Sequence, residues 1–208
     1  MSFIVIAIIV ANVLVSYKAF HDVFFFRKYE FHIGSIRSGE QIRMLTSAFL
    51  HVDMQHLFFN MFTLFLFAPY VASYGNDLFF LYIYFGSLVT GNLLTLYFHK
   101  NDYSYRAVGA SGAVTGIIYC AILLEPNLYM YGFIPGYVFG FAYLLFSIYG
   151  MKANNDNIGH VAHFGGAIGG YLITLFKFPE LIQNETLTVV ALLIPILILF
   201  VLQKTNKL

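Results

Sequence analysis

One serine of this chain has the surroundings of a catalytic nucleophile. Ser111 lies between Gly109 and Gly112 in the apolar stretch VGASGAVTG. A serine hydroxyl is a weak nucleophile unless a base within hydrogen-bond reach takes its proton. His163 is the candidate base, because it enters a second apolar, glycine-rich stretch, GHVAHFGGAIGG. Such a pair would transfer an acyl group to the serine and then hydrolyse the product.

A second group of polar side chains lies in the stretch LHVDMQHLFFNMF. His56 and Asn60 are four residues apart, so on a helix they share one face, and His51 precedes His56 by five residues. Polar side chains inside a membrane span are costly and mark functional sites by default. Two plainer interpretations stay open, because a histidine near a helix end is often interfacial and an asparagine can bond across a helix pair.

A zinc site is the sharper alternative for the histidines. Its ligands would be His51, His56, His160 and His163. The chain has no His-Glu-x-x-His motif, and no acidic residue lies inside the predicted spans that contain these histidines. We therefore expect no metal.

Glycine spacing predicts how the helices that carry the serine and the histidine meet. His163, Gly166 and Gly170 share one helix face, and Gly112 and Gly116 form a similar face on the other helix. Two such faces can pack backbone to backbone. Close packing alone explains most clusters of this kind, but a serine–histidine hydrogen bond also requires it, so the two interpretations are compatible.

The composition is that of an integral membrane protein. The chain is 60% hydrophobic and 10% charged, with a mean hydropathy of +0.76, whereas a soluble domain is about one quarter charged. A net charge of +1 argues against nucleic acid as a partner. Cys120 is the single cysteine, which excludes an internal disulfide. Residues 1–20 lack a basic start and a small-residue cleavage site, so we expect a retained anchor.

Apolar stretches predict an all-α membrane protein. A helix of roughly 20 apolar residues crosses the hydrocarbon core. We expect one domain over residues 1–208, with a six-helix core over about 1–178 and a seventh helix over 187–202, which Pro195 would kink. The predicted spans are Ser2–Phe20, Gln55–Tyr74, Leu78–Phe98, Val108–Leu124, Met130–Tyr149, Ile158–Phe176 and Leu187–Leu202.

The long connection from Asp22 to about Leu50 holds most of the charge and a run of aromatic residues. This mixture is too charged for hydrocarbon and too apolar for a free linker, so we expect a structure lying partly in the headgroup layer. An amphipathic connector without a binding role is the alternative. Acids such as Asp22, Glu30 and Glu40 among the basic residues predict paired charges in a folded loop.

Together these stretches resemble the rhomboid family of intramembrane serine proteases. The resemblance covers nearly the whole chain in order: the charged first loop, His-x4-His-x3-Asn in the second span, Gly-x-Ser-Gly opening the fourth and Ala-His-x2-Gly-x3-Gly in the sixth. Each motif alone is weak, and their order along a six-span core makes the match specific. The resemblance implies a six-helix rhomboid-like core and a protease that cuts transmembrane protein substrates within the lipid bilayer, without a cofactor.

The resemblance also implies a role for each motif residue. Ser111 is expected to be the nucleophile and His163 its general base, acting as a dyad without an orienting carboxylate. His56 and Asn60 are expected to stabilise the oxyanion together with the Ser111 backbone N–H. His51 matches a family histidine that is usually assigned to ordering this region.

Two positions depart from the family pattern. Arg43 matches the arginine of a first-loop Trp-Arg pair, but Ile42 stands where the tryptophan would be. Thr115, one turn after Ser111, stands where relatives often carry an aromatic ring that stacks on the histidine. Another residue must then hold His163 in place, or the base is more mobile.

Two other functions are weighed against proteolysis. A rhomboid-like pseudoprotease would bind membrane clients without cutting them, but such proteins typically lack the serine or the histidine. A small transporter or channel would carry paired intramembrane charges or broken helices at the midplane, and the sequence shows neither.

Membrane orientation is the point on which two arguments disagree. Family analogy puts the N-terminus in the cytoplasm and the catalytic mouth outside, in a bacterial cytoplasmic membrane. In this family orientation most basic residues fall on loops outside the cell, and Lys177 is nearly alone inside. The positive-inside rule therefore favours the opposite orientation. We keep the family orientation, because we expect the first-loop charges to be paired. The polar stretch at 150–160 is either a lid or a plain connector.

Overall fold

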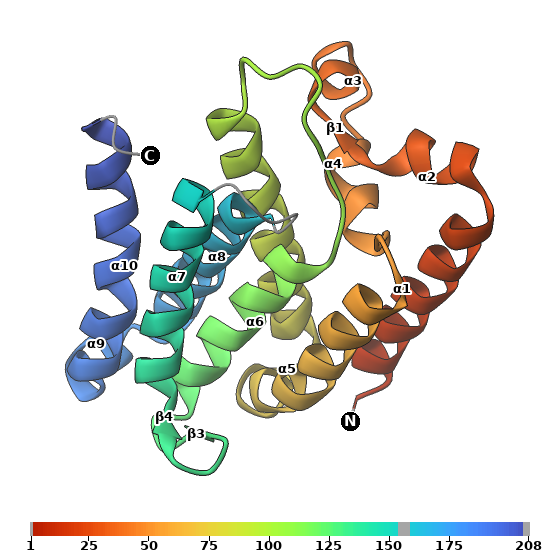
Figure 1. Ribbon diagram of the computed structural model, residues 1–208. Helices are drawn as coiled ribbons and strands as arrows, with labels where there is room; N and C mark the ends of the chain where they lie inside the picture. The colour runs from red at the N-terminus through yellow and green to blue at the C-terminus, as the bar shows by residue number, and fades with distance from the viewer. Residues whose placement is uncertain (1, 154–158, 206–208) are drawn as a thin grey trace.

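The computed structural model describes residues 2–153 and 159–205, which form a bundle of helices, with the short elements of residues 23–46 at one end and those of residues 129–135 and 181–184 at the other (Figure 1). The all-α membrane fold is as predicted. The long elements are α1 (Phe3–His21), α5 (Met54–Phe98), α6 (Ser111–Leu124), α7 (Gly136–Ala153), α8 (His160–Lys177) and α10 (Thr186–Lys204). The short elements are α2 (Val23–Tyr29), β1 (Phe31–His32), α3 (Ile33–Arg37), α4 (Arg43–Thr46), η1 (Ser47–Phe49), β2 (Arg106–Ala107), β3 (Tyr129–Met130), β4 (Ile134–Pro135) and α9 (Leu181–Asn184). Of the described helices, α1, α5 and α10 are long and apolar enough to cross a membrane by length and composition.

Helix α5 contains the second and third predicted spans, joined at a kink. Asn76 has φ 71° and ψ 175°, outside the helical region, and divides α5 into two halves. The Asn76 side-chain oxygen accepts the backbone N–H groups of Leu78 at 3.0 Å and Phe79 at 3.1 Å. Asparagine is among the residues that best tolerate positive φ, and here it caps the second half of the helix.

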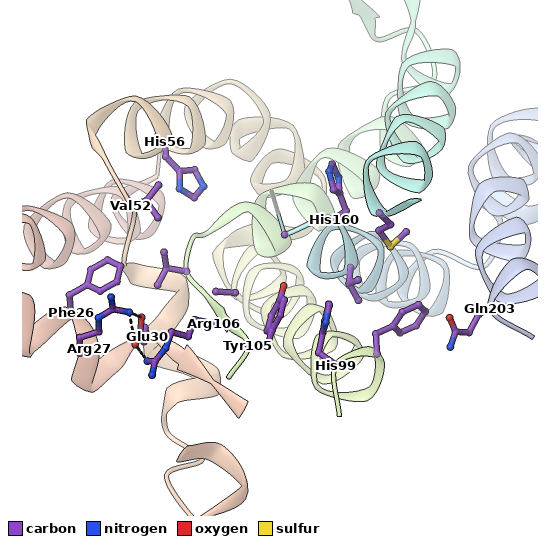
Figure 2. A pocket seen from close by; sticks show the side chains of 16 residues that line it. Phe26, Arg27, Glu30, Val52, His56, His99, Tyr105, Arg106, His160 and Gln203 are labelled. Carbon is purple, nitrogen blue, oxygen red and sulfur yellow. Dashed lines mark hydrogen bonds and ion pairs between the residues drawn. The ribbon is translucent and has the colours of Figure 1, made fainter. Parts of the chain in front are cut away.

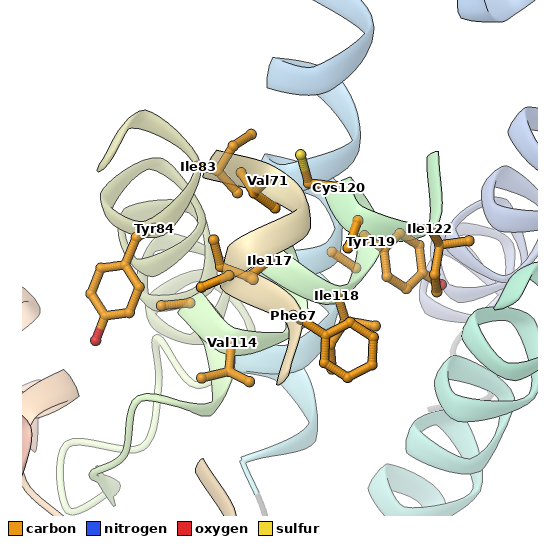
Figure 3. Packing of buried hydrophobic residues seen from close by; sticks show 14 of the residues in the cluster. Phe67, Val71, Ile83, Tyr84, Val114, Ile117, Ile118, Tyr119, Cys120 and Ile122 are labelled. Carbon is orange, nitrogen blue, oxygen red and sulfur yellow. The ribbon is translucent and has the colours of Figure 1, made fainter. Parts of the chain in front are cut away.

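Helix α6 is the central helix of the bundle. Every residue from Gly112 to Leu124 is buried, and α5 and α8 pack most extensively against it. Its apolar side chains, among them Ile117 and Ile118, form a packed cluster with Phe67 of α5 (Figure 3). A helix of 14 residues rises about 21 Å, less than the ~30 Å hydrocarbon core. Part of the backbone that adjoins α6 must therefore lie inside the layer, shielded by the surrounding helices.

The predicted fourth span begins too early. Helix α6 starts at Ser111 rather than Val108, because Gly109 has φ +127° and cannot be part of a helix. The last helix, α10, runs slightly further than predicted at both ends and continues through Pro195. The predicted start of the sixth span, Ile158, lies outside the described residues.

The predicted start of the fifth span is wrong. Met130 lies in β3, which pairs with β4 in a short hairpin, and α7 starts only at Gly136. Tyr131 and Gly132 have φ values of 54° and 78°, so the backbone turns sharply after Met130. Apolarity alone did not reveal this turn, because most residues of the hairpin are as apolar as those of the helix that follows.

The first loop is folded and packs on the segment that leads to Ser111. Strand β1 pairs antiparallel with β2, with Phe31 opposite Ala107. Phe31, Ile33 and Ile36 form a small buried cluster of their own. The Asp22 carboxylate accepts the backbone N–H of Phe25 at 2.9 Å and caps α2. The loop is therefore a structural support for the start of α6.

Candidate active site

The backbone before Ser111 is held in one conformation by its neighbours. Gly109, at φ +127°, donates its N–H to the Ser47 carbonyl at 3.0 Å. A Cβ at Gly109 would lie 2.7 Å from Cε1 of His56, closer than side-chain atoms approach. Only glycine therefore satisfies both the backbone angle and the close contact with the imidazole ring. Ser111 follows as the first residue of α6, with a half-buried side chain.

His51 is fully buried and ties the same loop to α1. The Ala110 N–H donates to Nε2 of His51 at 3.4 Å, so this nitrogen carries a lone pair. Nδ1 then carries the proton and donates to Ser16 Oγ at 2.8 Å, while the Ser16 hydroxyl donates to the Phe49 carbonyl at 2.9 Å. Burial lowers the pKa of His51 to about 3, and the nearby His56 acts in the same direction. The ring is therefore neutral near pH 7, as this bonding pattern requires.

The two predicted glycine faces of α6 and α8 meet backbone to backbone. A Cβ at Gly166 would overlap the Gly112 carbonyl, and a Cβ at Gly116 would lie 2.8 Å from the Gly166 carbonyl oxygen. Gly170 is equally close to Gly116. A Cβ at Gly112 would lie 3.1 Å from the carbonyl oxygen of Ala162. The residue after Ser111 and the residue before His163 are therefore in contact.

The proposed base contacts a tyrosine of α7. His163 is buried in the first turn of α8, and its Nδ1 lies 3.0 Å from the Tyr143 hydroxyl. The two rings are stacked at an interplanar angle of 26°, with centroids 5.6 Å apart. The Tyr143 hydroxyl also lies 3.3 Å from Thr115 Oγ1, which donates to the Ser111 carbonyl at 2.7 Å. Of the two alternatives left open by Thr115, the structure shows a residue that holds His163, and this residue is Tyr143 of α7.

His56 and Asn60 lie one turn apart at the start of α5. The His56 backbone N–H is capped by the Asp53 carboxylate at 2.7 Å, and its ring lies against Gly109. Within the described residues, Nδ1 of His56 has no hydrogen-bond partner. The Asn60 amide donates one N–H to the His56 carbonyl at 3.0 Å and has a second N–H to offer. Both side chains can supply donors next to the loop that precedes Ser111.

A buried carboxylate is the centre of the first loop. Glu30 is 2% exposed and pairs with Arg106 of β2 and, at 3.1 Å, with Arg27. Arg43, also buried, bonds the Glu40 carboxylate at 2.6 Å and the backbone carbonyls of Arg27 at 2.7 Å and Glu30 at 3.1 Å. The predicted charge pairing is present for Glu30 and Glu40, whereas the carboxylate of Asp22 caps α2. The Glu30 carboxylate is buried although both of its arginine partners are partly exposed, and removing Arg106 would take away one of the charges that compensate it. The cluster therefore helps to fix β2 and the chain that follows it.

The departure at the first-loop Trp-Arg pair concerns an exposed position. The Ile42 side chain is 59% exposed, whereas the neighbouring Arg43 is buried and makes its contacts through its guanidinium group. The hydrogen bonds of the arginine therefore do not depend on a ring at residue 42.

A cavity of about 700 Å³ opens between the first loop and the start of α8 (Figure 2). His56 and His160 line it from opposite sides, and the ion pair of Glu30 with Arg106 forms part of its wall. Ser111 and His163 are not among its lining residues. The cavity therefore lies beside the candidate site and has a mixed lining of polar and apolar side chains.

The four histidines of the zinc alternative form two separate pairs. The ring centroids of His51 and His56 are 4.9 Å apart, and those of His160 and His163 are 6.0 Å apart. Within residues 2–153 and 159–205, no group of three or more His, Cys, Asp or Glu side chains is arranged to hold a metal ion.

The stretch considered as a lid, 150–160, lies mostly outside the described residues. Its first residues, from Gly150 to Ala153, are the last turn of α7, and its last residue, His160, begins α8. A Cβ at Gly150 would overlap the His160 ring, so the ends of the two helices meet closely here.

Sequence reasoning missed two residues of the site. Tyr143 is one of several tyrosines in its helix, and no spacing distinguishes it; only the packing of α7 on α8 brings it to His163. Glu30 was recognised as a charge but not as a buried one. The Arg27–Glu30 spacing of three residues was the available signal for a local pair.

Comparisons with known proteins agree with the motifs. Residues 38–180 match the Rhomboid domain. The chain is 28% identical to RHOMBOID-like protein 12, mitochondrial, of Arabidopsis thaliana over 185 residues, which cover 79% of this chain and 55% of that protein. It is 33% identical to YdcA of Bacillus subtilis over 144 residues, covering 67% of this chain and 68% of YdcA. It is 32% identical to rhomboid protease GluP of the same organism, covering 65% of this chain and 26% of GluP. The chain thus spans little more than half the length of the Arabidopsis relative.

Proposed function

The chain belongs to the rhomboid family, and from that membership we propose that it is an intramembrane serine protease acting on transmembrane protein substrates. Ser111 is the proposed nucleophile and His163 the proposed general base. The relatives include GluP, which is named a rhomboid protease. The proposed enzyme is an integral membrane protein and needs neither a metal nor a cofactor.

The observation that supports this proposal most is the contact between the first turns of α6 and α8. Gly112 touches the carbonyl of Ala162 across the interface, and these residues adjoin Ser111 and His163 in the chain. A base must come within hydrogen-bond reach of a serine to activate it, and side chains on such closely packed turns can do so.

In the proposed reaction, Ser111 Oγ attacks the carbonyl carbon of the scissile peptide bond while His163 takes the hydroxyl proton. The carbon–nitrogen bond then breaks as His163 gives this proton to the leaving amine. A water molecule repeats the sequence on the acyl-serine and releases the new carboxyl end. Donors from His56, Asn60 and the Ser111 backbone would stabilise the developing negative oxygen. The cavity beside His56, whose lining is partly polar, would hold that water.

We also propose the family orientation, with the N-terminus in the cytoplasm and the first loop outside, in a bacterial cytoplasmic membrane. The ion pairs of Arg27, Arg43 and Arg106 with acidic residues support this choice. In the folded loop these basic side chains are held by carboxylates rather than left as isolated charges.

A fluorophosphonate probe tests the proposed nucleophile in detergent and in bilayers. Wild type should be labelled, Ser111→Ala should not, and His163→Ala should be labelled much more slowly. Ser147, a buried serine of α7, gives the matched control, because Ser147→Ala should be labelled like wild type. The same four proteins are then incubated with a panel of single-span substrates, and product is measured by gel electrophoresis.

A folded wild-type protein that is neither labelled nor able to cut any substrate would refute the proposal. Binding of single-span proteins without cleavage would favour the pseudoprotease alternative instead. Unchanged labelling of Ser111→Ala would show that the serine belongs only to the packing of α6.

A further inference from the structure

A chain of hydroxyl groups runs from the proposed base to the backbone of the proposed nucleophile. His163 Nδ1 lies 3.0 Å from the Tyr143 hydroxyl, and that hydroxyl lies 3.3 Å from Thr115 Oγ1. Thr115 Oγ1 lies 2.7 Å from the carbonyl oxygen of Ser111. The three side chains come from α8, α7 and α6, so the chain joins three helices.

Counting protons fixes the direction of every bond in this chain. A carbonyl oxygen only accepts, so the single hydroxyl proton of Thr115 is given to Ser111. Thr115 Oγ1 can then only accept from Tyr143, which uses the single phenolic proton. The Tyr143 oxygen must in turn accept from His163, so Nδ1 of the neutral imidazole carries its proton. In a neutral imidazole the other nitrogen, Nε2, then carries the lone pair.

We propose that Tyr143 is the positioning residue that holds His163 in this tautomer, with Nε2 as the basic atom offered to Ser111. This inference rests on the function proposed above. In a Ser-His-Asp triad a buried carboxylate accepts the Nδ1 proton and sets the tautomer. Here a phenol, oriented by Thr115 and the Ser111 carbonyl, accepts it. When His163 takes the serine proton, the Nδ1–H bond to Tyr143 stays in place.

The small residue at 115 makes this arrangement possible. Thr115 is buried one turn after Ser111, and its hydroxyl lies between the Ser111 carbonyl and the Tyr143 hydroxyl. The Tyr143 ring stacks on His163 and also on Phe139 of its own helix, at 14° with centroids 6.1 Å apart. A stacked ring between two neighbours has few rotamers, so its hydroxyl is held in a fixed place.

Tyr143→Phe tests the role of the hydroxyl while the stacked ring is kept. Removing a hydrogen bond to a group that becomes charged in the transition state slows a reaction about 10- to 100-fold. In Tyr143→Phe, kcat should therefore fall by about this factor while KM stays unchanged. Tyr119→Phe is the matched control. Tyr119 is a buried tyrosine of α6 whose hydroxyl donates to the Gly140 carbonyl of α7 at 2.9 Å, so its hydroxyl proton is used outside the hydroxyl chain. It should lose a comparable amount of stability and keep its kcat.

Changes at Thr115 test the direction of the chain. Thr115→Val removes the acceptor for the phenol, which is then free to donate to His163 Nδ1 and to favour the opposite tautomer, so kcat should fall. Thr115→Ser restores the hydroxyl and should restore kcat. Equal kcat values for wild type and Tyr143→Phe, or equal losses in Tyr143→Phe and Tyr119→Phe, would overturn the inference.

Nitrogen-15 NMR of histidine-labelled protein decides the tautomer without any substrate. The His163 signals are assigned by their loss in His163→Gln. Wild type should show a protonated Nδ1 and an unprotonated Nε2, and Tyr143→Phe should show a mixture of tautomers. A protonated Nε2 in wild type would overturn the inference. An inactive wild type with the expected tautomer would instead refute the proposed protease and leave the role of Tyr143 in fixing the ring supported.

Discussion

Replacing Gly166 with alanine should push α8 away from α6 at the level of the proposed dyad. The added Cβ would overlap the Gly112 carbonyl oxygen and lie 2.7 Å from the carbonyl carbon and 3.1 Å from Cα. Non-bonded carbon atoms settle at about 3.5–4.0 Å, so the two backbones must separate by roughly 1 Å. The Gly112 atoms that the new Cβ meets belong to the backbone, so they cannot rotate away as a side chain could.

The expected cost follows from two opposing effects. Overpacking a close contact costs about 1–3 kcal/mol, and the better helix propensity of alanine returns about 0.8–1 kcal/mol. A contact with rigid backbone belongs in the upper part of the first range, so the net loss should be about 1–2 kcal/mol. A misplacement of about 1 Å between reacting groups can cost about 100-fold in rate. The rate of fluorophosphonate labelling should therefore fall by far more than the stability loss alone explains.

Gly86→Ala is the matched control for this experiment. Its added Cβ would meet only the far end of the Ile173 side chain, which can rotate. Both variants are unfolded by heat and by denaturing detergent, and their labelling rates are measured under conditions in which all proteins are folded. Gly86→Ala should resemble wild type in both assays. Full stability and full labelling of Gly166→Ala would refute the backbone-contact argument, as would equal losses in the two variants.

Three further predictions concern the oxyanion donors, the buried histidine and the orientation. His56→Ala and Asn60→Ala should each lower kcat about 10- to 1,000-fold with little change in KM; unchanged cleavage by the double variant would remove both from the mechanism. The pKa of His51 falls from 6.5 to about 3 on burial, so its contribution to stability is complete above pH 6.5 and is lost as the pH falls toward 3. Unfolding measured against pH should show this loss in wild type and a smaller one in His51→Gln. The native cysteine is buried and should not react with an impermeant thiol reagent. Added outside, this reagent should label Ser38→Cys and not Gln183→Cys. The reverse would contradict the proposed orientation.

The sequence predicted the parts of the fold that follow from periodicity and apolarity. The glycine spacing of α6 and α8 correctly indicated which faces meet, because only residues without side chains allow that approach. The apolar runs also located the long helices, including the two halves of α5, although not all of their ends. The hairpin before α7 was missed, because Tyr131 adopts positive φ, which its residue type does not predict.

The site was predictable only where a motif carries the information. The Ser111 and His163 motifs are local in sequence and could be read directly. Tyr143 belongs to neither motif, and its contact depends on how three helices cross. The sequence did indicate that something must replace the ring missing at Thr115. Which residue does so is decided by tertiary packing, and a single sequence contains no signal for it.

The place of Tyr143 on α7 makes the geometry of the base depend on the position of a neighbouring helix. A hydrogen bond of 3.0 Å is lost when its atoms separate beyond about 3.5 Å, so a lateral shift of α7 by less than 1 Å would release the imidazole. A transmembrane segment that displaced α7 on its way to the site would therefore release the imidazole, and the return of the helix would fix it again. Such an enzyme would not cut membrane proteins that only contact it briefly, because the base is positioned only when α7 has returned and the site is closed.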